Sequence, residues 1–304
     1  MMKTVLVITS SQDSLVDYVI AIYSKKCFFF RLDLDRMSDY NFQLNEYGWS
    51  IDNYREFVTD RTIDAIYYRK PVFPNFRKYD GHFQDLMKKD IEMLIGGIVN
   101  AFEGKCLSRP HILECAENRV YQMYLAKKIG FNMPESLITN SPRCMDKFCA
   151  GKKCIVKPLS IGKGSFFSHE RTSRANVNNY HPRPLDGLEI RPAYFQQAMV
   201  KDYEVIVNFI CDKSYVVRID IVSKKNIGKE EKHIKYSHMV LPKEIKEKCL
   251  SYMKAMDLQF GAFDFIVQNG EYYFLEVNPN AQWLGLENEL GWDLSAKIIE
   301  YLCL

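Results

Sequence analysis

Residues 260–282 constrain the fold of this chain more than any other stretch of its sequence. Two runs rich in Phe, Ile, Val and Tyr flank Asn269-Gly270, a dipeptide that strongly indicates a β-hairpin turn. Three polar residues interrupt these runs, namely Asp264, Glu276 and Asn278. Buried carboxylates are costly unless they are paired or bind a metal, and Mg²⁺ prefers carboxylate and amide oxygens. The segment therefore predicts a hairpin that carries a magnesium site, with ordinary solvent-facing acids as the alternative.

The strand register decides whether these side chains can share one cation. Period-2 alternation predicts Glu276 and Asn278 on the same face of the second strand as Tyr272 and Phe274. A strict two-residue turn would set position 264 opposite position 275 and put the two carboxylates on opposite faces. Shared binding by Asp264 and Glu276 therefore requires a three-residue loop or a bulge in the chain between positions 268 and 272.

The composition is that of a globular protein. The chain has 304 residues, 47% hydrophobic and 26% charged, and its net charge of +3 does not indicate nucleic-acid binding. It shows neither a signal peptide nor an apolar run long enough to span a membrane, so we expect a cytoplasmic protein. Nine cysteines without C-x-x-C spacing favour reduced packing residues over disulfides or a zinc site.

Apolar periodicity predicts a chain of mixed strands and helices. The expected strands cover residues 5–10, 27–34, 63–69, 153–157, 193–199, 204–210 and 214–222. The expected helices cover residues 14–26, 83–102, 117–129, 242–258 and the C-terminus from 294. Core packing accounts for the apolar stripe of the helix at 83–102. The lysine-rich residues 224–235 are predicted to form a loop, either a solvated one or a cationic lid.

A lysine that precedes a glycine-bearing loop indicates phosphate binding. Lys157 closes a short apolar strand, and Gly162 and Gly164 follow it. Glycines let backbone N–H groups approach phosphate oxygens, and the ammonium group offsets their charge. The order differs from G-x-x-x-x-G-K-[ST], in which the lysine follows the glycines, and a solvated surface turn is the alternative.

Taken in order, the segments of this chain resemble the ATP-grasp ligases, and more narrowly the graspetide or microviridin-type enzymes that macrocyclise ribosomal peptides. The resemblance rests on residues 31–35 (RLDLD), 68–71 (YRKP), 117–122 (ENRVYQ), 134–139 (PESLIT), 157–165, 194–200 and 275–280 (LEVNPN). It implies an α/β (α+β) chain with an ATP-grasp fold. It also implies a Rossmann-like pre-ATP-grasp domain over residues 1–112, a central ATP-grasp subdomain over 113–198 and a C-terminal subdomain over 199–304.

The resemblance also assigns roles to residues that bind ATP and Mg²⁺. It implies that Asp264, Glu276 and Asn278 hold Mg²⁺, which in turn binds the β- and γ-phosphates. The phosphate and nucleotide contacts implied are Arg119, Lys157, Gly162, Gly164, Gln197, Ala198, Met199, Val200 and Glu204. Residues 197–200 form the hinge whose backbone reads adenine, and Glu204 lies near the ribose.

The chain also departs from the family pattern. Arg119 stands where the family commonly has a phosphate-binding lysine, and its guanidinium can still bind phosphate. The family's Asp-x-Arg signature is missing, and Lys232 is the nearest candidate for the catalytic cation that stabilises an acyl-phosphate. Ile206 and Ala281 replace an arginine and a glycine of the family.

The implied activity is ATP-dependent joining of an Asp or Glu carboxylate to an amine or hydroxyl of a ribosomal precursor peptide, which has a leader and an acidic core. Arg69 and Lys70 end an apolar strand and could bind this peptide or cap the edge of their domain. One alternative is a ligase that adds a free amino acid to a protein or small molecule, resembling the ribosomal-protein glutamate ligases. Another is a degenerate ATP-grasp protein without turnover. No membrane partner is expected, and a homodimer is compatible with the sequence.

Overall fold

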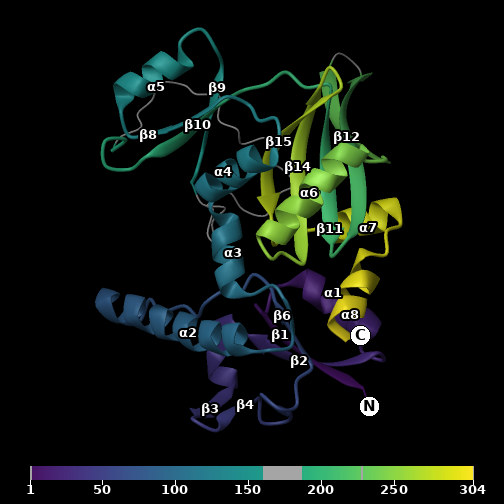
Figure 1. Cartoon of the computed structure of the whole chain (residues 1–304). Helices are drawn as coiled ribbons and strands as arrows, with labels where there is room; N and C mark the ends of the chain where they lie inside the picture. The colour runs from purple at the N-terminus through teal and green to yellow at the C-terminus, as the bar shows by residue number, and fades with distance from the viewer. Residues whose placement is uncertain (1, 160–186, 227–228, 304) are drawn as a thin grey trace.

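The structure is a computed structural model that describes residues 2–159, 187–226 and 229–303, with the backbone alone at 223–226 and 229–232. Within these ranges the strands form four sheets, which Figure 1 shows from the N-terminal domain at the bottom to the C-terminal sheet at the upper right. Membrane crossing would require a longer and more apolar helix than any in the described ranges.

The N-terminal domain is built on a parallel sheet in the order β2-β1-β6-β7, as expected for a Rossmann-like unit. Its strands are β1 (Lys3–Thr9), β2 (Cys27–Asp33), β6 (Ala65–Tyr68) and β7 (Lys105–Leu107). Strands β1 and β6 are buried on both faces, which explains their continuous apolar sequence.

Helices and a small sheet cover the two faces of this parallel sheet. On one face lie α1 (Ser14–Tyr23) and, from the other end of the chain, α8 (Leu294–Cys303), which packs on β1, β6 and β7. On the other face lie α2 (Gly81–Ala101) and an antiparallel sheet of β3 (Asn41–Asn45), β4 (Gly48–Asp52) and β5 (Phe57–Thr59). A short 3₁₀ helix, η1 (Leu34–Asp39), follows β2.

Helix α2 is packed only along its second half. Ile95, Ile98 and Val99 are buried against the sheet, whereas Phe83 is 60% exposed and Leu86 54% exposed. Figure 1 shows the start of the helix extending away from the domain. The prediction that core packing explains the whole apolar stripe is therefore wrong for its first half, because the sheet beneath the helix does not reach that far.

The middle of the chain forms a smaller antiparallel sheet in the order β8-β10-β9. Its elements are α3 (Pro110–Glu117), α4 (Arg119–Ile129), β8 (Ser136–Thr139), α5 (Pro142–Cys149), β9 (Cys154–Lys157) and β10 (Ala193–Gln197). The helix predicted over 117–129 starts only at Arg119, because the Asn118 side chain caps α4 by accepting the N–H groups of Val120 and Tyr121.

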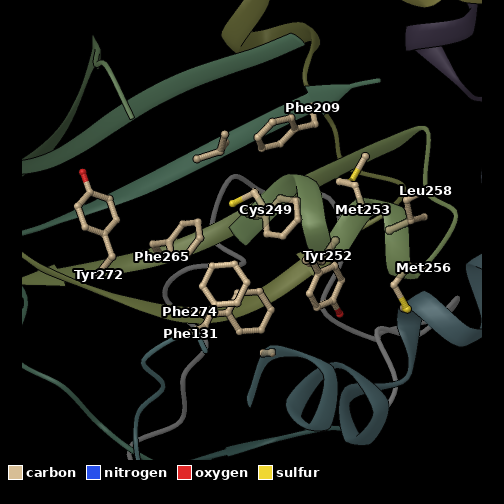
Figure 2. Packing of buried hydrophobic residues seen from close by; sticks show 14 of the residues in the cluster. Phe131, Phe209, Cys249, Tyr252, Met253, Met256, Leu258, Phe265, Tyr272 and Phe274 are labelled. Atoms are coloured by element: carbon tan, nitrogen blue, oxygen red, sulfur yellow. The ribbon is translucent and has the colours of Figure 1, made fainter. Parts of the chain in front are cut away.

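The C-terminal sheet is antiparallel, in the order β13-β12-β11-β14-β15. Its elements are β11 (Tyr203–Ile210), β12 (Lys213–Asn226), β13 (Lys229–His238), α6 (Lys243–Ala255), β14 (Phe260–Gln268), β15 (Glu271–Asn278) and, after the sheet, α7 (Leu284–Leu290). An aromatic core joins α6 to the sheet (Figure 2). In it Phe131 stacks on Phe274 at 5.1 Å between ring centroids, and Tyr252 packs edge-on against Phe263 at 5.5 Å.

The lysine-rich segment is not the loop that the sequence predicts. Residues 224–235 lie largely in β12 and β13, which pair in register from Val217↔His238 to Asn226↔Lys229. Within the described residues β13 pairs only with β12, so it is an edge strand. Charged residues are common on edge strands because they oppose further strand pairing, and Asp220 lies opposite Lys235 here. A high charge therefore marks an edge in this segment rather than a loop.

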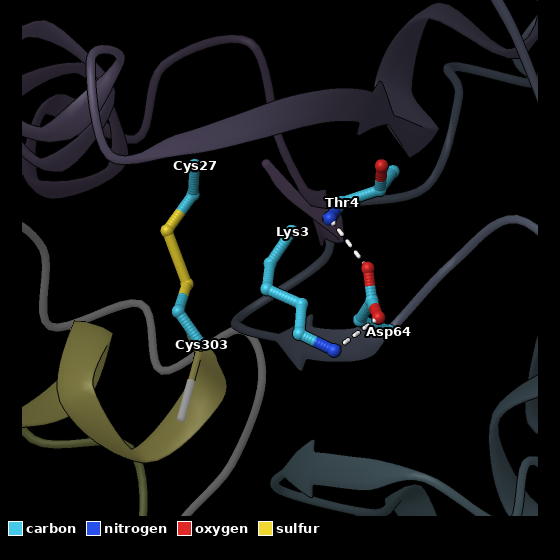
Figure 3. Close-up of a disulfide and its surroundings, with 5 residues drawn as sticks. All are labelled: Lys3, Thr4, Cys27, Asp64 and Cys303. Carbon is cyan, nitrogen blue, oxygen red and sulfur yellow. Dashed lines mark hydrogen bonds and ion pairs between the residues drawn. A yellow bond between two sulfur atoms is a disulfide. The ribbon is translucent and has the colours of Figure 1, made fainter. Parts of the chain in front are cut away.

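One disulfide joins the two ends of the chain. Cys27, at the start of β2, is bonded to Cys303 on α8 across a separation of 276 residues (Figure 3). The prediction that the cysteines are all reduced is therefore wrong for this pair, while seven others have free thiols. Nothing in the spacing of the cysteines indicates which two meet, because their contact depends on α8 returning to the N-terminal sheet.

Candidate functional site

The predicted hairpin exists, and its register brings the two carboxylates together. Asp264 lies directly opposite Glu276, and Ala262 lies opposite Asn278. The turn at Asn269-Gly270 has two residues, both with positive φ, as in a type I′ turn. The prediction of the 264–276 pairing is confirmed, whereas the loop or bulge expected between positions 268 and 272 is absent.

The extra residue that makes this register is Leu275. Phe265 still lies opposite Phe274, and the next pair is Asp264 with Glu276, so Leu275 is a β-bulge. Phe274 is buried in the aromatic core, and Glu276 emerges on the opposite face with Asp264. The prediction that Phe274 and Glu276 share a face is wrong, because a bulge shifts the alternation by one residue.

Two cations lie against this carboxylate pair. Arg119, at the start of α4, donates from Nη2 to Glu276 Oε2 at 2.6 Å and from Nη1 to the Pro158 carbonyl at 3.1 Å. Its backbone N–H donates to the Leu159 carbonyl at 3.1 Å. The start of α4 is thereby tied both to β15 and to the end of β9, where Lys157 lies.

Burial changes the pKa of Lys157 and of a tyrosine beside it. The pKa of Lys157 is lowered, chiefly because its ammonium group is removed from water, and the negative charges of Glu276 and Asp264 oppose that shift. Tyr194 lies opposite Lys157 in the β9–β10 pair, and burial raises the pKa of its hydroxyl. The charge of Arg119 lowers the pKa of Tyr194 and the charge of Glu276 raises it, so the Tyr194 hydroxyl belongs to the same cluster. Sequence analysis missed this tyrosine, whose apolar neighbours suggested only a strand.

The donor set fits Mg²⁺ bound together with phosphate. Two facing carboxylates and the Asn278 amide supply the hard oxygen ligands, and Lys157 and Arg119 supply positive charge beside them. The Arg119 Nε is buried and has no hydrogen-bond partner among the described residues, so it has a donor to offer an anion. In the described ranges no three His, Cys, Asp or Glu residues cluster as a metal site.

The predicted hinge connects the two ATP-grasp sheets. Strand β10 ends at Gln197, whose N–H donates to the Glu135 carbonyl at 2.9 Å, and the chain then leads to β11. The Ala198 N–H donates to the Lys153 carbonyl at 2.9 Å, Met199 is partly buried and Val200 is 77% exposed. The role of residues 197–200 in binding adenine stays a prediction.

Other candidates for this site lie along β11 or outside the description. Glu204, on β11, forms an ion pair with Lys201, and its neighbour two positions along, Ile206, lies opposite Asp264. Gly162 and Gly164 lie outside the described residues. The backbone of Lys232 lies in β13 opposite Ser223, and its side chain is outside the description.

Arg69 and Lys70 lie in different environments. Arg69 is 1% exposed, and its guanidinium pairs with Asp13 at 3.3 Å and donates to the Gln282 side chain at 2.8 Å. It therefore ties the N-terminal sheet to the loop after β15, which fits the domain-capping role rather than direct contact with a peptide. Lys70 has a φ of 40°, and burial together with the charge of Arg69 lowers its pKa to about 8.

The chain has the ATP-grasp fold, with the paired carboxylates and the cations where the middle and C-terminal sheets meet. Residues 200–302 match the family model of the RimK-like ATP-grasp domain. No curated protein sequence matches the chain at a significant level.

Solved structures of similar fold cover nearly the whole chain. The macrocyclase MdnC from Microcystis aeruginosa, solved with its precursor peptide MdnA, is 25% identical with a TM-score of 0.82, over 98% of this chain and 99% of that one. The macrocyclase MdnB from the same organism is 24% identical with a TM-score of 0.79, over 99% of each chain. A RiPP-associated ATP-grasp ligase from Chryseobacterium gregarium, solved with ADP and a leader and core peptide, is 20% identical with a TM-score of 0.79, over 99% and 96%.

Proposed function

We propose that this chain is an ATP-dependent ligase that forms ester or amide crosslinks between side chains of a ribosomal precursor peptide. The observation that carries the proposal is the pairing of Asp264 with Glu276 beside Arg119 and Lys157. The similarity to MdnC over the length of both chains supports a peptide as the substrate.

The charges of this site suit phosphoryl transfer from ATP to a peptide carboxylate. An Asp or Glu carboxylate of the peptide attacks the γ-phosphorus of ATP, ADP leaves and an acyl-phosphate forms. A Lys amine or a Ser/Thr hydroxyl of the same peptide then attacks the acyl carbon, loses its proton and expels phosphate. Arg119 and Lys157 bind the phosphates and offset their charge during the transfer. Asp264, Glu276 and Asn278 would hold Mg²⁺, which neutralises the phosphate oxygens when bound.

Mass spectrometry of the product tests the proposal. Incubation of the protein with ATP, Mg²⁺ and a precursor peptide rich in Thr/Ser and Asp/Glu should remove one water from the peptide for each bond formed. An increase in mass by an amino-acid residue would instead identify a ligase that adds free amino acids, the second candidate, which the RimK-like match favours. Absence of ADP release with both kinds of substrate would identify a nucleotide-binding protein without turnover.

Lys70 is the proposed contact for an acidic side chain of the peptide. Its pKa of about 8 means that its ammonium group is largely charged at pH 7 and largely neutral at pH 9. Peptide affinity should therefore fall as the pH rises from 7 to 9, and Lys70→Met should remove this dependence. Calorimetric titration of the precursor peptide at both pH values measures it. Equal pH dependence in parent and Lys70→Met protein would remove Lys70 from the peptide site.

The compartment and the assembly are also part of the proposal. We expect the enzyme in the cytoplasm, because a ribosomal precursor peptide is made there. Light scattering of the purified protein would distinguish a homodimer, which is compatible with the sequence, from a monomer.

A further inference from the structure

The side chain of Gln122 is bound entirely to backbone groups. It lies on α4, is 2% exposed, and its Oε1 accepts the Val277 N–H at 3.0 Å. Its Nε2 donates to the Val277 carbonyl at 2.8 Å and to the Ala116 carbonyl at 2.5 Å. Both amide hydrogens donate and the amide oxygen accepts one bond, so each polar atom of the side chain has a backbone partner.

These bonds satisfy backbone groups on the outer edge of β15. Within the described residues β14 is the only strand paired with β15, and the outer edge of β15 has an isolated β-bridge between Tyr273 and Asn132. The Asn132 carbonyl accepts the Phe274 N–H at 2.8 Å on this edge, and the Gln122 amide satisfies both backbone groups of Val277. A side-chain amide has the same kinds of donor and acceptor as a peptide group. Gln122 therefore satisfies the backbone N–H and C=O of one edge residue, as a further paired strand would do along the whole edge.

The bonded residue has a special position in the site. Val277 lies between Glu276 and Asn278, two residues after the bulge at Leu275. A bulge leaves the ladder locally disrupted, so the strand needs another constraint there to hold its side chains in place. Three residues before Gln122, Arg119 contacts Glu276 from the same helix. Helix α4 therefore holds Glu276 in two ways. Arg119 binds its carboxylate, and Gln122 binds the backbone of the next residue, Val277.

We propose that Gln122 is a positioning residue that holds Glu276 and Asn278 in the geometry needed for Mg²⁺ with nucleotide; this inference rests on the proposed function. Residues that orient metal ligands change metal affinity when they are replaced, roughly ten- to hundredfold. A tie that serves only stability would lower the melting temperature without changing the response to Mg²⁺.

The test compares Gln122→Met with Leu125→Ala. Methionine has a similar length and makes none of the three hydrogen bonds, while Leu125→Ala removes buried packing from the same helix and leaves them intact. Each protein is titrated with Mg²⁺ at saturating ADP, with the melting temperature and calorimetric heat as readouts. We expect the half-saturating Mg²⁺ concentration of Gln122→Met to rise roughly ten- to hundredfold and that of Leu125→Ala to stay at the parent value.

Three outcomes separate this inference from the proposed function. A parent protein that shows no response to Mg²⁺ with ADP would overturn the proposed function itself. A parent that responds, with Gln122→Met behaving like Leu125→Ala, would overturn the positioning role alone. If Gln122→Met does not fold, Gln122→Asn keeps an amide that is one methylene too short for both Val277 bonds. Its half-saturating Mg²⁺ concentration should also rise, and a parental value would contradict the proposal.

Discussion

Glu276→Gln should keep the fold and abolish Mg²⁺-dependent formation of ADP. The glutamine amide oxygen can still accept from Arg119, so we expect a loss of unfolding free energy of only about 1–3 kcal/mol. The missing negative charge removes a ligand that faces Asp264 across the β14–β15 pair. Because the β- and γ-phosphates are then poorly neutralised, turnover should fall by on the order of a hundredfold or more.

A coupled assay measures the rate of ADP formation, and thermal unfolding measures the loss of stability. Glu271→Gln is a matched control, since Glu271 is on the same strand, is exposed and lies next to the turn. It should release ADP at the parent rate. A folded Glu276→Gln protein with parental turnover would show that this carboxylate is an ordinary surface acid, and the assignment of the metal site would fall with it.

Lys157→Ala should weaken nucleotide binding by about 1.5–3 kcal/mol, the size of a lost charge-assisted hydrogen bond. The ammonium group lies at the end of β9 among Arg119, Glu276 and Asp264, away from bulk water, where its interaction with phosphate is little screened. Since the pKa of Lys157 is lowered, its contribution should also decrease at high pH as the ammonium group loses its proton.

Calorimetric titration with a non-hydrolysable ATP analogue measures this loss. Lys153→Ala is the control, because Lys153 is exposed and contributes only its backbone carbonyl to the hinge at Ala198. Unchanged affinity in a folded Lys157→Ala protein would remove Lys157 from the site. Lys157→Ala and Glu276→Gln should also differ in their kinetics. Lys157→Ala should raise the nucleotide concentration required for half-maximal turnover, whereas Glu276→Gln should lower the rate at saturating nucleotide.

The sequence predicted the chemistry of the hairpin better than its geometry. Carboxylates in an apolar strand need a partner, and sharing one Mg²⁺ required that Asp264 lie opposite Glu276, as it does. The bulge at Leu275 was not predictable, because contacts from Asn132 and Gln122, far away in the chain, hold β15 in that register. Gln122 itself left a weak signal, as a polar residue on the buried face of α4 next to Leu125 and Ala126.

Other differences between prediction and structure also have long-range causes. The sequence left Arg69 either to bind a peptide or to cap its domain, and its burial depends on Asp13 and on the distant Gln282, which pair with its guanidinium. The pairing of Cys27 with Cys303 depends on the path of α8. Local patterns worked best where a segment meets its partners nearby, as in β1 and β14. They failed where tertiary neighbours decide what is exposed.

Helix α8 has a consequence for how the protein is made. Its residues Leu294, Ile298 and Leu302 complete the core on the face of the N-terminal sheet that carries Val5 and Tyr67. Helix α1 packs on the same face, but synthesis proceeds from the N-terminus, so the part that α8 covers stays exposed until α8 has been translated. The first domain therefore reaches its final core only once α8 has left the ribosome. An isolated fragment of residues 1–112 would expose the apolar residues that α8 covers to solvent and to other chains.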